Sequence, residues 1–145
     1  MAVTIQLYDH AASKFADGSF AVGDTYTINL YTTLSFDATA TTKAAAESGA
    51  TQVSTANGYT QDAKNLASVA VSVVTTNDAK FDAADVQWTA SGGSIAAAKA
   101  LIYNNTDAND PPVAYIDLDG TQSAGDGTTF NIVWNAGGIV TFTVT

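Results

Sequence analysis

The stretch from Ala97 to Leu118 reads AAKALIYNNTDANDPPVAYIDL and holds two runs that are largely apolar on both faces. Strands that are covered on both faces read in this way, so Ala97–Tyr103 and Val113–Leu118 predict central strands of a sheet. Between them lies Asn109-Asp110-Pro111-Pro112, where neither proline can donate a hydrogen bond to a ladder. The stretch therefore predicts two central strands that are joined by a loop.

Outward from this pair, side chains alternate between apolar and polar with a period of two, which is typical of a half-buried strand. In Asp24–Thr32 the apolar Tyr26, Ile28 and Leu30 share one face. Further strands are expected at Val3–Leu7, at Leu66–Val74 with Val69, Val71 and Val73 in phase, at Asp85–Thr89, around Phe130, Ile132 and Trp134, and around Val140, Phe142 and Val144.

Turn residues separate these runs, and they decide the fold class that we expect. The punctuating pairs are Asp17-Gly18, Asn57-Gly58, Gly92-Gly93, Asp119-Gly120, Asp126-Gly127 and Gly137-Gly138. Short strands between such turns predict an all-β, single-domain antiparallel β-sandwich over residues 1–145, Ig-like or jelly-roll-like.

A short N-terminal helix is expected at His10–Phe15, with Asp9 as its N-cap. The predicted core includes Ile28, Leu30, Val71, Trp88, Ile102, Tyr115, Ile132, Trp134 and Phe142.

The segment from Phe36 to Asn57 has the weakest pattern of the chain, being rich in Thr and Ala and poor in large apolar groups. Helix propensity within it is limited to Lys43–Glu47, and Gly49 and the flanking threonines make that helix marginal. We expect a long loop over residues 36–57, either simply mobile or serving as a contact arm.

Composition excludes several function classes. The 145 residues include five basic residues and 14 acidic ones, for a net charge of −9, and no cysteine. This charge repels phosphate backbones and anionic membrane surfaces, so neither nucleic acid nor a membrane is an expected partner. No apolar stretch approaches the roughly 18 residues that a membrane helix needs. The N-terminus lacks a basic region followed by an apolar run, so no signal peptide is expected.

No catalytic, cofactor-binding or metal-binding residue is assigned, and we expect the chain not to be an enzyme. His10 is the one histidine, and no Gly-x-Ser-x-Gly elbow accompanies it, which favours a surface or packing role. Two groups of aspartates are candidate calcium ligands or carboxylate pairs, but neither completes a ligand set, which favours turn capping and solubility. The groups are Asp107, Asp110, Asp117 and Asp119, and Asp78, Asp82 and Asp85.

Aromatic residues raise one more alternative, a surface on which sugar rings stack. Trp88, Trp134, Phe130 and Tyr115 are the candidates for it. Their positions in phase on alternating strands favour packing in the core instead.

Taken along its length, the chain resembles the small virion structural proteins of tailed bacteriophages and prophages. The segments that carry the resemblance are Tyr8-Asp9-His10, Lys14–Gly18, Thr25–Tyr31, Asn57–Thr60, Lys80–Ala90 running into Gly93-Ser94-Ile95, Ala100–Asn104, Val113–Asp117 and Phe130–Asn135. These segments are features of a fold and not of a catalytic site.

The resemblance implies a capsid decoration (cement) protein, made in the host cytoplasm and located on the capsid surface of the virion. The implied partners are the major capsid protein and further copies of the chain in a small homo-oligomer. The alternative is a tail or fibre component that acts as a binding module. Residues 1–20 and 36–57 are the expected docking segments.

Overall fold

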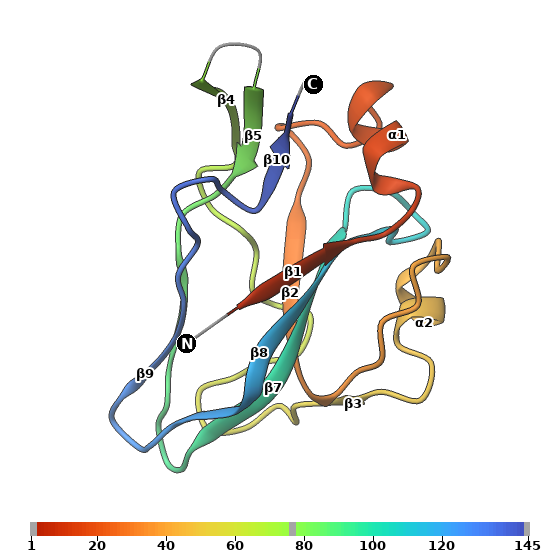
Figure 1. Cartoon of the computed structure of the whole chain (residues 1–145). Coiled ribbons are helices and arrows are strands. Elements are labelled where there is room, and N and C mark those ends of the chain that lie inside the picture. The colour runs from red at the N-terminus through yellow and green to blue at the C-terminus, as the bar shows by residue number, and fades with distance from the viewer. Residues whose placement is uncertain (1–2, 76–77, 144–145) are drawn as a thin grey trace.

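The computed structural model describes residues 3–75 and 78–143, and in them the chain is all-β with two short helices (Figure 1). The strands pair antiparallel throughout, which confirms the expected fold class, while the Ig-like or jelly-roll-like subtype stays a prediction. The elements are β1 (Thr4–Leu7), α1 (Ala11–Ala16), β2 (Tyr26–Thr33), α2 (Lys43–Ala46), β3 (Thr51–Gln52), β4 (Ala70–Thr75), β5 (Asp78–Asp82), β6 (Val86–Thr89), β7 (Ile95–Asn104), β8 (Pro112–Ala124), β9 (Thr129–Ile132) and β10 (Val140–Phe142).

The largest sheet has the strand order β1-β8-β7-β2-β3, so β7 and β8 are interior strands, as their apolar sequences predict. The register places Ile28 of β2 opposite Ile102 of β7, and Ala100 of β7 opposite Ile116 of β8. The prediction of a loop over residues 109–112 is wrong at its last residue, because Pro112 begins β8 opposite Tyr103. A proline is tolerated there because the first residue of a strand need not donate.

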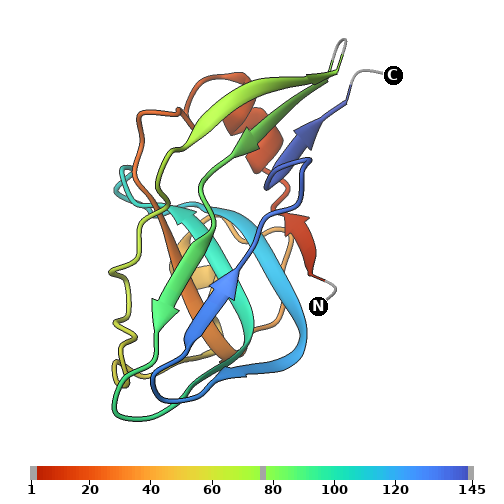
Figure 2. The same ribbon diagram turned by 90° about the vertical axis from the view of Figure 1, so that its left-hand side faces the viewer.

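Two small sheets have the orders β6-β9 and β10-β5-β4. Figure 2 shows the β6-β9 pair lying over one face of the large sheet and the β10-β5-β4 sheet lying at one end of it, where Phe81 and Phe142 pack on Phe15 of α1. The chain connects the two small sheets twice, because β5 leads into β6 and β9 leads toward β10. Trp134 bridges the break between them: its backbone N–H donates to Asp85 Oδ1 (2.9 Å) and its indole N–H donates to the Ala84 carbonyl (3.0 Å). Trp134 thus ties the two small sheets together where the chain passes from one to the other.

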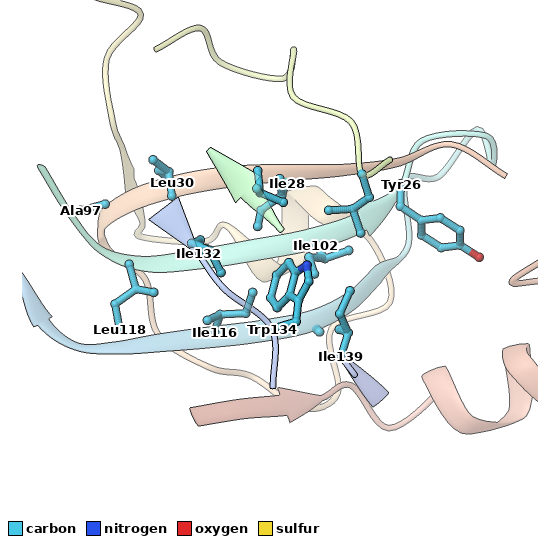
Figure 3. Close-up of a cluster of buried hydrophobic side chains, with 14 of the residues drawn as sticks. Tyr26, Ile28, Leu30, Ala97, Ile102, Ile116, Leu118, Ile132, Trp134 and Ile139 are labelled. Carbon is cyan, nitrogen blue, oxygen red and sulfur yellow. The ribbon is translucent and has the colours of Figure 1, made fainter. Parts of the chain in front are cut away.

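The main core lies between these sheets, and Figure 3 shows Ile28, Ile102, Ile116 and Trp134 pointing into it. Most of the predicted core is confirmed: Ile28, Leu30, Trp88, Ile102, Tyr115, Ile132 and Trp134 are buried, and Phe142 is half-buried against the cluster. Val71 is the error, since its side chain is 53% exposed. It lies on β4 at the edge of a small sheet, where the period of two persists without a layer to cover it.

A second core lies on the opposite face of the large sheet and includes Tyr31, Leu101 and Tyr115. Residues 36–57, expected as a loop, contain α2 and β3 and cover this face in part. Thr42 Oγ1 caps α2 by accepting from the Ala45 N–H (3.2 Å), and the small Ala40 and Ala46 are buried against the tyrosines. Small side chains let this segment approach the sheet closely.

Three local predictions need correction. The N-cap of α1 is His10, which makes no side-chain capping hydrogen bond. Asp9 lies one residue before the cap, and its backbone N–H donates to the Ala38 carbonyl (2.9 Å). The strand expected at Leu66–Val74 begins only at Ala70, because Ser68 takes a positive φ of 56°. Strand β5 was not predicted at all, and Val144 lies outside the described residues.

Trp134→Ala should lower the free energy of unfolding by about 3–5 kcal/mol, because it removes a buried ring and leaves a cavity. The change also removes the indole hydrogen bond across the break. Urea unfolding followed by circular dichroism measures the loss. Val22→Ala is the control, since Val22 is 51% exposed and its truncation should cost less than about 0.5 kcal/mol. Equal losses in the two variants would contradict this description of the core.

Gly58→Ala and Gly18→Ala form a matched pair that separates steric contact from backbone strain. Both glycines take a positive φ, 88° and 81°, which costs an alanine roughly 1 kcal/mol. A Cβ on Gly58 would lie 2.1 Å from the Thr89 carbonyl oxygen, whereas nothing lies within 4 Å of one on Gly18. Gly58→Ala should therefore be the more destabilising by about 1–3 kcal/mol in thermal or urea unfolding. Similar values would show that the turn does not pack on β6 as described.

Candidate interaction surface

The aspartates on β8 are held by neighbours in the sheet. Asp117 lies 2.6 Å from Lys99 Nζ on the adjacent strand β7, and its Oδ1 accepts from the Asp119 N–H (3.0 Å). These contacts, with the Lys99 hydrogen bond first, lower the pKa of Asp117 below its ordinary value. Asp119 itself takes a positive φ of 57° in an irregular part of the strand. Asp117 thus binds a backbone N–H of its own strand, and Asp119 takes a left-handed backbone conformation next to it.

The structure does not gather the first aspartate group into a site. Asp107 and Asp110 lie in the connection before β8, where Asp107 accepts from the Asn109 N–H (2.9 Å) and stands 3.8 Å from Lys14. Asp117 lies five residues into β8 from Pro112, which corresponds to about 17 Å of strand. Grouping Asp107 and Asp110 with Asp117 and Asp119 implied that they lie together at one strand end, and this is wrong.

The second aspartate group is engaged in local structure. Asp82 pairs with Lys80 (2.9 Å) on its own strand, and Asp85 accepts the backbone N–H of Trp134. Asp78 begins β5 and belongs to the same strand as Asp82. Within residues 3–75 and 78–143, no three histidine, aspartate or glutamate side chains come together in a way that suits a metal ion.

His10 is placed for packing. Its ring lies between Tyr8 and Phe20, with centroids 6.4 and 6.1 Å away. Burial lowers the pKa of His10, and the Pro112 backbone opposes that shift only in part, so the neutral ring is favoured. The nearby Ser13 hydroxyl donates to the His10 carbonyl (2.8 Å) and not to the ring, so these two residues do not form a nucleophile–base pair.

The aromatic candidates for sugar stacking are buried, which confirms core packing. Trp88, Phe130 and Trp134 belong to the main core and Tyr115 to the second one. A polar hollow of about 430 Å³ lies beside Trp88, but Lys64 Nζ stands 5.9 Å from that ring. Trp88 is only 6% exposed and therefore offers no platform for a sugar.

A polar network that the sequence reasoning missed joins α2 to the second face of the sheet. Lys43 Nζ lies 3.2 Å from Glu47 Oε1 and 3.0 Å from Asp62 Oδ1. Asp62 also accepts from Asn29 Nδ2 (2.5 Å) and from the Tyr103 hydroxyl (3.0 Å). The i,i+4 spacing of Lys43 and Glu47 was visible in the sequence, but the approach of Asp62 was not.

This network is a clamp and not a reaction site. Burial alone would raise the pKa of Asp62, but the hydrogen bonds from Asn29 and Lys43 outweigh it and hold that pKa below its ordinary value. The Tyr31 hydroxyl donates to Glu47 Oε1 (2.5 Å), and burial, the largest cause, raises the pKa of Tyr31 far above its usual range. The charged oxygens are thus engaged with partners that fix the segment to the sheet.

The surface best suited to a partner is an apolar groove beside α1. It has a volume of about 290 Å³, and its lining is made of Ala12, Phe15, Ala16, Phe20, Val71 and Phe142. Phe15 forms its floor by packing on Phe81 and Phe142, with ring centroids 4.9 and 5.3 Å away. At its rim lies β4, whose Val71, Val73 and Val74 are 53%, 78% and 41% exposed. We call the six lining residues the α1 groove.

Comparisons of the chain with models of protein families, with curated proteins and with solved structures find no match. In the described part of the chain, no helix has the length and apolar character that crossing a membrane requires.

Asp62→Asn should lower the free energy of unfolding by about 1 kcal/mol at pH 7, because it removes a half-exposed charge that accepts several hydrogen bonds. The folded-state pKa of Asp62 is below its unfolded value, so this stability is present above about pH 4 and is lost as the pH falls through the folded pKa. Urea unfolding at pH 7 and at about pH 2 measures both values.

The exposed Asp9 provides the control, and Asp9→Asn should match the wild type at pH 7. A deficit of Asp62→Asn that is the same at both pH values would contradict the role given to its charge.

Proposed function

We propose that the chain is a virion structural protein that decorates the head of a tailed bacteriophage by binding the outside of the assembled shell. The observation that carries the proposal is the α1 groove, a neutral, apolar depression on an otherwise acidic domain. Contiguous exposed apolar surface of this kind marks a site where another protein binds. The resemblance to small virion proteins supplies the kind of partner, the major capsid protein.

The groove favours one of the two expected docking segments. Helix α1, within residues 1–20, provides Ala12, Phe15 and Ala16 to its lining. Residues 36–57 instead carry Ala40 and Ala46, which are buried against the sheet. We therefore place docking on the α1 face.

A small domain that docks through one groove makes a weak contact, and repetition on a shell makes it effective. An oligomer links several such contacts, so the later ones form at high effective concentration. Binding to the assembled shell and not to the loose subunits then stabilises the shell by mass action.

The test is to delete the gene, purify the particles and heat them while following DNA release. Heads without the protein should assemble and should leak DNA at a lower temperature, and adding the purified chain should restore the wild-type value. Location of the protein on the tail by electron microscopy would overturn the proposal in favour of a tail or fibre component. Absence from particles would overturn both.

A matched pair of variants tests the groove itself. Ala12→Glu puts a charge into the lining, whereas Ser13→Glu puts the same charge on the same helix outside that lining. Both side chains are exposed, so both variants should fold. Ala12→Glu should lose binding to undecorated heads by tenfold or more, corresponding to about 1.4 kcal/mol, and Ser13→Glu should retain it. Equal binding by the two would place docking elsewhere.

A further inference from the structure

Strand β4 is built unlike the edge strand of a monomer. It ends the sheet order β10-β5-β4, so among the described residues one side of its backbone has no ladder partner. Its sequence AVSVVT contains three valines, and the side chains from Ala70 to Val74 are exposed on both faces. Natural edge strands are normally protected by a charge, a proline or a covering element. Strand β4 has neither a charge nor a proline, and its one recorded irregularity, a register shift against β5 between Val73 and Thr75, lies at its C-terminal end. The part from Ala70 to Val73 is regular and therefore offers its edge to another strand.

Charge indicates which strand fits. Residues 65–77 contain no ionisable side chain, although the chain as a whole carries a net charge of −9. A basic partner would be matched by acidic residues here, and they are absent from this segment of the sequence. A second copy requires the opposite, because residues near a two-fold axis face their own counterparts and a charge would face itself. The neutral segment lets two acidic chains approach without direct repulsion.

We propose that β4 pairs antiparallel with β4 of a second copy, with the two-fold axis at Ser72. In this register Ser72 faces its counterpart, and Val71 lies opposite Val73 of the second copy. Opposed residues of an antiparallel ladder point to the same face, so the valines pack in pairs and the two three-stranded sheets form one of six strands. Backbone hydrogen bonds then complete the free edge of each β4.

This pairing also reaches the α1 groove. Val71 lines the groove and lies on β4, so the opposed Val73 of the second copy comes to stand beside it. The two grooves of the dimer then share one continuous apolar border across the axis. The inference goes beyond the proposed function and is independent of it, since self-association is a property of the chain in solution and needs no phage head.

The first experiment uses the absence of cysteine from the chain. Ser72→Cys should cross-link to a covalent dimer under mild oxidation, because opposed residues of an antiparallel pair have Cβ atoms within about 4.5–5.5 Å, close to disulfide distance. Val22→Cys is the exposed control, from the loop between α1 and β2 and outside the β4 ladder, and should stay monomeric on denaturing gels. Equal cross-linking of the two variants would overturn the proposal, as would none in Ser72→Cys at concentrations where the wild type is dimeric.

The second experiment tests the symmetry. Sedimentation equilibrium of the full-length wild type should show a dimer, and Ser72→Lys and Ser72→Asp should each associate at least tenfold more weakly because like charges face each other. An equimolar mixture of the two variants should recover association, which also shows that both are folded. A wild type that stays monomeric over about a thousandfold range of concentration would overturn the proposal. So would a mixture that associates no better than its components.

Discussion

The register of β7 against its two neighbours is the constraint on which the rest of this structure depends. Ile28, Ile102 and their neighbours point into the main core, while Tyr31, Leu101 and Tyr115 point to the second one. Because side chains alternate with a period of two, a slip of one residue would exchange the two faces. The Trp134 bridge, the clamp on Lys43 and the cover formed by α2 all require each face to carry its own set of side chains.

The sequence predicted the parts of the fold that depend on local pattern. Two-sided apolar runs identified β7 and β8, and in-phase aromatic residues were rightly placed in the core. The same periodicity misassigned Val71, because alternation describes a strand and does not say whether a layer covers it. Residues 36–57 were predicted as a loop for a related reason. Alanines contribute little to a hydrophobic pattern, but the alanines of this segment pack closely on tyrosines.

The groove and the polar clamp were beyond sequence reasoning because both join distant segments. The Lys43–Asp62 contact depends on α2 and the stretch after β3 meeting over the same face of the sheet. The groove similarly joins α1 to β4 and β10. Elsewhere on the surface, Lys80 and Lys99 each pair with an aspartate of their own sheet. The acidic chain thus carries an apolar groove whose six lining residues are uncharged.

The pairing of β1 with β8 has a consequence for the order in which the protein is made. Thr4 lies opposite Asp117, so one edge of the large sheet is completed by residues that are far apart in the sequence. During synthesis β1 emerges long before β8, the strand that receives it, so this edge of the sheet closes only after β8 has left the ribosome. Contacts of such long sequence separation slow folding. This edge of the sheet therefore stays incomplete until β8 has been translated, and a chain that terminates before β8 lacks the acceptor for β1.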